Sequence, residues 1–457
     1  MKLATLDGRR FNLSCLVGIV LSVVALMAPH AYGFTIQDAV QVAIRTHPTV
    51  QAARELRRVA DQGVRQARAG FFPTIDLRAS GGWARTNNST TRGRSNRIGT
   101  ESQSRNLWRG ESSLTASQMI WDAGSTRNLS DSAHARAGVS AYQVLDVSES
   151  IGLRVITAYL GVIRARRLHA LARTNVDRHI EIRDKIKIQV DSGAGNASDL
   201  DQAEGRLSSV EATLVQLVGG IRDSEAAYLE AVGEAPNGEL VLPNVSPELL
   251  PQTSEDAVRW AVESNPALQA AIKNVEAQRG SYEATQGSMR PRFSFDVTGS
   301  RNENSGGATG SGNDLAGLLV MTYNVFRGGA DLAAHRAAAA LLTEAKHREF
   351  ETRRLVEQNT RVSYTAYRMA LQRVPVLKTQ VGSTEQALEA YYEEFAVGRR
   401  TLLDLLDVEG EVFAARSAHT DAEISVLQSH YTLLVVVGRL LKAIDVAVGE
   451  EAQLPEN

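Results

Sequence analysis

The chain has 457 residues and a formal net charge of −2 at pH 7, so its overall electrostatics give no reason to expect nucleic acid as a partner. It is long enough for two or three ordinary domains. Its one cysteine, Cys15, lies in an N-terminal segment that we expect to be removed, so we expect neither disulfides nor cysteine-ligated metals in the mature chain.

The N-terminus has the three parts of a secretory signal. A basic start is followed by an apolar stretch at 16–27 and by the small-residue site Ala31-Tyr32-Gly33. We therefore interpret residues 1–33 as a signal peptide and expect the mature chain to begin at Phe34. Arg9-Arg10 leaves export by the twin-arginine route open, although a basic start is the commoner explanation.

The mature chain consists of two similar halves. Residues 35–48 (TIQDAVQVAIRTHP) recur as residues 253–266 (TSEDAVRWAVESNP), and Pro73 recurs as Pro291 at the same offset of 218. Further along, Asp199-Leu200 recurs as Asp404-Leu405 at an offset of 205. A period of about 200 residues is far longer than that of a solenoid, so we interpret the chain as a duplicated and fused unit.

The duplication and the distribution of proline set the expected boundaries. We expect the first structural repeat at 34–235, a proline-rich inter-repeat linker at 236–252 and the second structural repeat at 253–446. The polar C-terminal tail at 447–457 is expected to be disordered.

Apolar and polar residues alternate after each of the paired prolines, as in Ile75-Asp76-Leu77-Arg78-Ala79. This period of two predicts a strand in each repeat, and return strands are expected at 107–121 and 315–326. Lengths of about ten residues suit membrane-spanning strands. The polar connections at 86–106 and 302–314 are typical of solvent-exposed tips, and the different offsets of the two halves place a loop of different length there.

Two very long helices follow the strand pairs. Between 125 and 190 proline is absent and apolar residues recur three and four apart, which predicts one helix spanning on the order of 100 Å. The second repeat predicts its counterpart at 329–395, with a kink at Pro375. Shorter helices at 198–232 and 401–446 complete a helical hairpin in each repeat.

Four residues mark the expected transitions between helix and strand. Pro73 and Pro291 precede the first strand of each pair, and Gly124 and Gly329 follow the second strand. Glycine permits the sharp change of direction from a strand into the long helix, and proline ends a helix.

After residue 33 no segment offers about 18 uninterrupted apolar residues, so a membrane crossing would have to use strands. Four strands cannot close a barrel, and open strand edges are not tolerated in lipid. We therefore expect several chains to complete one barrel, and three chains would give twelve strands. The predicted fold class is α+β: long α-helical coiled-coil hairpins with a four-strand contribution per chain to a trimeric transmembrane β-barrel.

Together these features resemble one known family. The duplicated order of helix, strand, strand and helical hairpin, the His-Pro and Asn-Pro pairs at 47–48 and 265–266, and the segment 398–409 (GRRTLLDLLDVE) resemble the TolC-like outer membrane channel proteins. The resemblance covers nearly the whole mature chain. It implies a homotrimer in outer membrane lipid, with helices in the periplasm.

The resemblance also implies a function. Such a duct passes substrates outward from an inner-membrane transporter, with a periplasmic adaptor (membrane fusion) protein between them. It implies no enzyme activity and no cofactor. In agreement, the sequence has no Gly-rich phosphate loop followed by Gly-Lys-Ser or Gly-Lys-Thr, and its histidines lack metal-ligand spacing.

The resemblance assigns a periplasmic constriction to Asp404 and Asp407, which share one face of a helix. In a trimer, six carboxylates around one opening would attract cations and raise one another's pKa. The alternative is that they are acidic residues favoured by the dipole at a helix start.

The resemblance also assigns the gating contacts. Arg400 matches the arginine that ties a second-repeat hairpin to a neighbouring chain, and Ser198 with Asp199 match its first-repeat partners. Phe395 stands where the family often has a tyrosine, so a hydrogen bond expected there is missing. The alternative is that Arg400 is simply exposed and that Asp199 is a helix-start residue.

Two cargo classes compete within the duct interpretation. The sequence pattern and the lack of a lipidation cysteine after the signal favour type I protein secretion over efflux of drugs or metals. A protein of another class, a periplasmic coiled-coil adaptor without a pore, would not need the alternating segments after Pro73 and Pro291. An exported enzyme is the weakest alternative, because no motif supplies a nucleophile, a base and an oxyanion donor.

Overall fold

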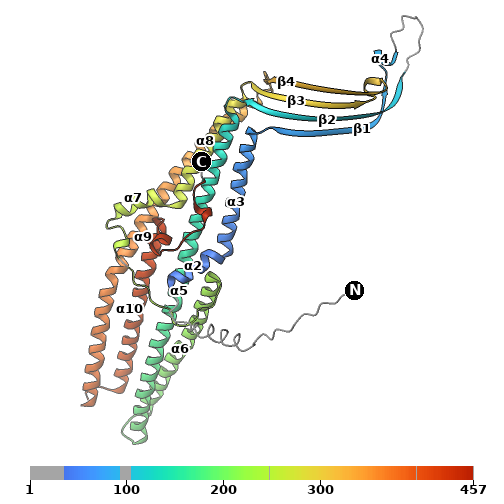
Figure 1. Ribbon diagram of the computed structural model, residues 1–457. Helices are drawn as coiled ribbons and strands as arrows, with labels where there is room; N and C mark the ends of the chain where they lie inside the picture. The colour runs from blue at the N-terminus through green and yellow to red at the C-terminus, as the bar shows by residue number, and fades with distance from the viewer. Residues whose placement is uncertain (1–34, 93–103, 246, 398, 456–457) are drawn as a thin grey trace, which may run out of the picture.

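The computed structural model describes residues 35–92, 104–245, 247–397 and 399–455 (Figure 1). The expected signal peptide therefore lies outside the described residues. The first half contains α2 (Ile36–Thr46), α3 (Pro48–Arg68), η1 (Ala69–Phe71), β1 (Thr74–Thr86), α4 (Ser89–Arg92), β2 (Arg105–Trp121), α5 (Ser125–Asp191) and α6 (Ala197–Val232). The rest contains η2 (Pro247–Leu249), α7 (Ser254–Ser264), α8 (Pro266–Ser288), β3 (Arg292–Glu303), η3 (Ser305–Gly307), β4 (Ser311–Thr322), α9 (Ala330–Ala396), α10 (Leu402–Val436), α11 (Leu440–Ala443) and η4 (Glu450–Ala452).

The main elements of the two halves match one another in order and length. The long helices α5 and α9 each have 67 residues, and their return helices α6 and α10 have 36 and 35. The predicted fold class is confirmed. Among the described residues, none of the helices combines the length and the apolar character needed to cross a membrane.

The short helices begin in the same way in both halves. Thr35 and Thr253 are the N-caps of α2 and α7, and each side chain accepts a hydrogen bond from the backbone N–H three residues later. A few residues on, His47 and Asn265 cap α3 and α8, each of which has proline at its first position. Proline loses no hydrogen bond there, because the first helical N–H has no partner within the helix.

The four strands form one antiparallel sheet in the order β1-β2-β3-β4, which extends from one end of the helices (Figure 1). One row of the register joins Leu77, Leu114, Gly299 and Leu315. The strands β1 and β4 are the edges of this sheet, so each has an unpaired side in the single chain.

The expected strand limits were partly wrong in the second half. β4 ends at Thr322 rather than at 326, and the connection between β3 and β4 is only 304–310 because both strands run further toward the tip. The expected difference in loop length is present, since β1 and β2 are separated by residues 87–104.

The main core lies where the long helices meet the short ones. It joins α2, α5, α6, α8 and the end of α10, with Tyr159 and Leu433 among its fully buried side chains. α5 is central, because it packs against α3, α6, α8 and α10. In contrast, α9 buries only Ala345, Val356, Thr360 and Tyr367, and it continues through Pro375 as one helix.

The helix expected at 401–446 ends ten residues early. α10 stops at Val436, and Gly438 adopts a left-handed conformation with φ of +71°. The N–H groups of Gly438 and Arg439 then close the helix by donating to the carbonyls of Val435 and Leu434. The backbone of residue 264 also approaches Gly438 so closely that a β-carbon would not fit.

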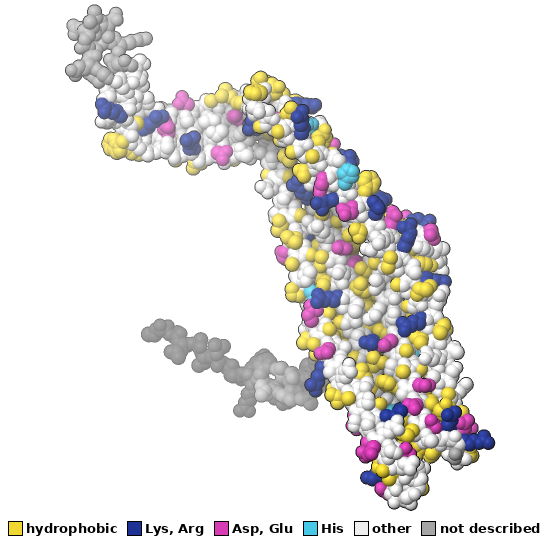
Figure 2. Space-filling view, turned by 180° about the vertical axis from the view of Figure 1, so that it is seen from behind, with side chains coloured by type: hydrophobic (Ala, Val, Ile, Leu, Met, Phe, Trp, Pro, Cys, Tyr) yellow, Lys and Arg dark blue, Asp and Glu magenta, His cyan; other side chains and the backbone are white. Residues whose placement is uncertain are grey.

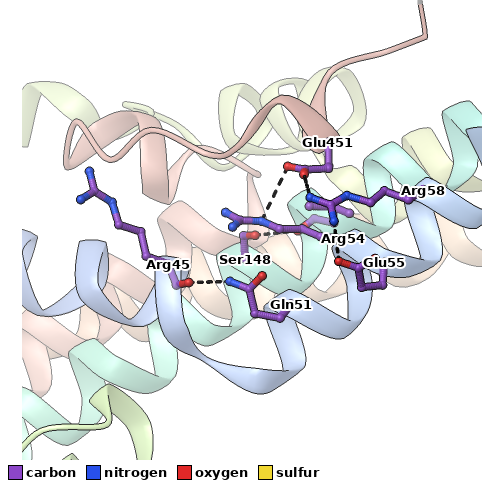
Figure 3. A network of polar contacts seen from close by, with 8 residues as sticks. Arg45, Gln51, Arg54, Glu55, Arg58, Ser148 and Glu451 are labelled. Atoms are coloured by element: carbon purple, nitrogen blue, oxygen red, sulfur yellow. Dashed lines mark hydrogen bonds and ion pairs between the residues drawn. The ribbon is translucent and has the colours of Figure 1, made fainter. Parts of the chain in front are cut away.

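The expectation of a disordered C-terminal tail was wrong for residues 447–455. Glu451 lies between Arg54 and Arg58 of α3, at 3.9 Å and 3.1 Å respectively (Figure 3). Arg57 also donates to the carbonyl of Gln453 at 3.0 Å. The tail is therefore held on α3 by charge and by backbone contacts, which composition alone did not reveal.

Candidate functional site: the helical tips and the two faces of the sheet

The two helical hairpins end side by side, far from the sheet (Figure 1). A small separate core joins them there, formed by Ile182, Ile186, Ala203, Leu402, Leu405 and Leu406. Phe395 packs against this core from α9. The residue at the position of the expected tyrosine therefore contributes apolar contact rather than a hydrogen bond.

Asp404 has a defined role at the start of α10. Its carboxylate accepts the backbone N–H and the hydroxyl of Thr401, both at 2.9 Å, while the Thr401 hydroxyl accepts the N–H of Asp404 at 3.2 Å. The backbone hydrogen bond from Thr401 lowers the pKa of Asp404. In the single chain Asp404 thus acts as a helix-capping residue, as in the alternative interpretation, and its place in a constriction stays a prediction.

Asp407 lies one turn further along α10. It forms an ion pair with Arg206 of α6, so it joins the two hairpins of one chain. More than half of its side chain remains exposed. A carboxylate with this exposure can still contribute negative charge to an opening.

The structure pairs Arg400 within its own hairpin. Its Nε donates to Glu394 at 2.8 Å, and its guanidinium lies 4.0 Å from the centre of the Tyr391 ring. Ser198 and Asp199 lie in the first turn of α6, and Ser198 is exposed. Among the ion pairs of the described residues, Arg400 is joined to Glu394 and not to Asp199. The expected contact lies between chains and stays a prediction.

The sequence did not identify a buried polar group near the tips. Glu409 is 7% exposed and accepts the hydroxyl of Tyr392 at 3.2 Å. Burial, followed by the charge of Glu409, raises the pKa of Tyr392 to about 12. A signal was present, because Glu409 continues the apolar spacing of Leu402, Leu405 and Leu406 and so occupies a core-facing position.

The two faces of the sheet differ in chemistry. One face presents exposed apolar side chains: Ile75, Leu77, Leu114, Phe295, Leu315 and Leu319. The opposite face is polar. On it, the hydroxyls of Thr115 and Thr298 share a hydrogen bond of 3.1 Å, and the hydroxyl of Ser117 donates to Asp296 at 2.5 Å. This alternation is the pattern of a strand with lipid on one side and water on the other.

Each of the four transition residues lies at a junction of helix and sheet. Gly124 and Gly329 are the N-caps of α5 and α9, with φ of +84° and +83°. That left-handed conformation strains any residue with a β-carbon. Pro73 directly precedes β1, and Pro291 directly precedes β3.

A sheet with one apolar and one polar face, open at both edges and continued by helical hairpins, defines an outer membrane channel protein that completes its barrel with further chains. The chain belongs to the outer membrane efflux protein family, whose model matches residues 39–234 and 258–439. The resemblance inferred from the sequence is confirmed, and members of this family are channels rather than enzymes. The protein lies in the outer membrane, with its helices extending into the periplasm.

Two curated relatives cover most of the chain. The outer membrane efflux protein BepC of Brucella suis biovar 1 is 24% identical over 92% of this chain and 89% of its own length. The alkaline protease secretion protein AprF of Pseudomonas aeruginosa is 22% identical over 92% of this chain and 87% of its own.

Solved structures with the same fold include two channels. The outer-membrane channel OprN matches with a TM-score of 0.76 and 19% identity over 88% of this chain and 89% of that chain. The open state of the Neisseria gonorrhoeae channel MtrE matches with a TM-score of 0.71 and 19% identity over 92% and 90%. At these identities the structures establish the fold alone.

Proposed function

We propose that three copies of this chain form the outer membrane exit duct of a tripartite export system, together with a periplasmic adaptor and an inner-membrane transporter. The observation that carries the proposal is the open sheet, because its two edges leave backbone groups unpaired in lipid unless other copies cover them. Its polar face then lines the duct, and its apolar face contacts lipid.

An exposed stripe on α9 supports the same assembly. Leu355, Val362, Met369 and Val376 recur every seven residues and are between 48% and 68% exposed. A seven-residue apolar repeat is the seam of a coiled coil and needs a partner helix. Within the described part of one chain this seam is exposed, so a neighbouring copy is the natural occupant.

The internal repeat supports a proposal for which helix of the neighbouring copy covers α9. Within one chain, Arg164 of α5 binds Asp421 of α10 through two hydrogen bonds of 2.7 Å and 3.1 Å. At the repeat offset, residue 164 corresponds to Met369 of α9 and residue 421 to Gln216 of α6. The contact between α5 and α10 therefore predicts an equivalent contact between α9 and α6 of the next copy.

Cysteine cross-linking tests this assembly directly, because the chain has no cysteine after Cys15. Met369→Cys with Gln216→Cys should give disulfide-linked dimers and trimers in outer membranes under mild oxidation. Met369→Cys with Ser208→Cys is the control, since Ser208 lies about 12 Å further along α6. Absence of cross-linking in the first pair, or equal cross-linking in both, would contradict the proposed interface.

Within this duct we propose that the tips form the closed end. Asp404 and Asp407 of three chains would form a cation-selective constriction, and Arg400 would bind Ser198 and Asp199 of a neighbour, in exchange for its bond to Glu394. Single-channel conductance of Arg400→Ser should rise if the latch exists, and unchanged conductance counts against it. Replacement of both aspartates by alanine should shift the reversal potential toward lower cation selectivity.

We propose type I protein secretion as the transport process. The relative AprF, named for alkaline protease secretion, supports this proposal over 92% of the chain. Efflux of drugs or metals is the second candidate, and the relative BepC, named as an efflux protein, supports it. Deletion of the gene distinguishes these two functions. Loss of secreted proteins from the medium supports type I secretion. Hypersensitivity to drugs or metals, with an intact set of secreted proteins, supports efflux.

A further inference from the structure

The apolar face of the sheet ends at a defined border. Ile75 lies two residues beyond Pro73 and Phe295 lies four residues beyond Pro291, and their side chains are 68% and 45% exposed. Exposed aromatic side chains mark the border itself, namely Phe71, Phe72, Trp121, Tyr323 and Phe326. Aromatic residues concentrate at the level of lipid headgroups, so this border lies at the periplasmic surface of the membrane.

Arginines cluster just beyond that border. Arg65, Arg68, Arg127 and Arg290 are exposed, lie within nine residues of a strand and come from three different segments; we call them the collar. In Figure 2, dark blue side chains lie beside yellow ones where the sheet meets the helices. A fifth arginine in this zone, Arg327, is paired with Asp331 at 3.4 Å.

Acidic side chains lie near the collar, since Asp131 and Glu283 line the same hollow as Arg68, but they form no ion pair with it. Among the described residues, none of its four arginines forms an ion pair with a carboxylate. Asp122, the nearest acid on the chain before Arg127, is already used, because its carboxylate accepts the N–H groups of Gly124 and Thr126. The four exposed guanidinium groups are therefore available to an anionic ligand, on a chain whose total charge is −2.

We propose that the collar binds the phosphate groups of anionic phospholipids in the inner leaflet of the outer membrane. A planar guanidinium can bind two phosphate oxygens at once, and its position next to the aromatic border places it at phosphate depth. Basic residues at a membrane surface strengthen binding to anionic lipid by about fivefold each. The collar thus fixes the height of the barrel in the membrane, independently of the cargo that passes through it.

Native mass spectrometry of the full mature protein in detergent tests the proposal, with phosphatidylglycerol or phosphatidylcholine added at equal concentration. The parent protein should retain phosphatidylglycerol in preference to phosphatidylcholine. Arg65→Gln, Arg127→Gln and Arg290→Gln together should reduce that preference about fivefold or more. The matched control replaces the exposed residues Arg173, Lys187 and Arg222 of the helical hairpins by glutamine, which removes the same charge and should leave the preference unchanged.

Two outcomes would overturn the proposal. The collar variant could keep the full preference for phosphatidylglycerol, or the control variant could lose as much of it, in which case net charge alone governs binding. If the collar variant instead changes ion selectivity in planar bilayers without changing lipid retention, the arginines face the duct and not the lipid. Correct folding of both variants is checked by their oligomer mass in the same spectra.

Discussion

The buried carboxylate of Glu149 should make the stability of this protein fall as pH rises. Glu149 is on α5 and only 2% exposed, and its two oxygens accept the N–H groups of Leu440 and Leu441 at 3.0 Å and 3.3 Å. Burial raises the pKa of Glu149 to about 7, against the opposing effect of these two hydrogen bonds, and the charge of Asp146 one turn away raises it further.

The direction of this pH dependence follows from the protonation of Glu149 in the folded and in the unfolded chain. Below pH about 4.5 the group is protonated in both the folded and the unfolded chain, so it has no effect on stability. Between pH 4.5 and about 7 the unfolded chain ionises first, and the free energy of unfolding falls. A pKa difference of this size corresponds to a loss on the order of 3 kcal/mol per chain, which is complete above pH 7.

Glu149→Gln removes this titration and keeps one acceptor oxygen. Near pH 5 we expect the free energy of unfolding of the variant to equal that of the parent, less about 1–3 kcal/mol for the N–H that loses its acceptor. Relative to the parent it should gain stability as pH rises to 8. Urea unfolding of the detergent-solubilised protein at both pH values measures this difference, with the exposed Glu211→Gln as control. A difference between variant and parent that is independent of pH would refute the reasoning.

Three further predictions concern the packing of a glycine, a buried hydrogen bond and a helix cap. A β-carbon at Gly280 would lie 2.8 Å from a backbone oxygen of α5, so Gly280→Ala should lower stability by about 1–3 kcal/mol, whereas Gly63→Ala, with open space around it, should raise thermal stability. Tyr392→Phe should cost about 1–3 kcal/mol in denaturant unfolding, because Glu409 is buried and loses its donor. Thr401→Ala removes the cap of α10 and should lower stability by about 1 kcal/mol, with faster amide exchange confined to the tip as its signature.

The duplication made most of the fold predictable. Two halves with the same sequence pattern form the same elements in the same order, so the strand pairs and long hairpins could be placed from Gly124 and Gly329, whose φ values differ by only one degree. The repeat also contained evidence for the early end of α10. Val232-Gly233 ends α6 and corresponds to Val437-Gly438, so a comparison of the two halves indicated the break that the helical period alone missed.

Side-chain pairing at the tips was less predictable. Arg400 pairs with Glu394 in its own hairpin, and the sequence gives no distance that decides between this carboxylate and one on another chain. The prediction for the C-terminal tail failed for a related reason. Glu451 is held by arginines almost 400 positions earlier in the chain, and no local pattern reports such a contact.

Asp404 and Asp407 should respond differently when the tips open. The bonds of Asp404 to Thr401 lie within the first turn of α10, so they survive any motion that carries the second hairpin as a unit. The ion pair of Asp407 with Arg206 joins the two hairpins, so the same motion must stretch or break it. If opening separates the hairpins, Arg206→Gln should favour the open state without altering the helix start of α10. Unchanged conductance of that variant, with a cation selectivity equal to that of the parent, would mean that the two hairpins of one chain move together.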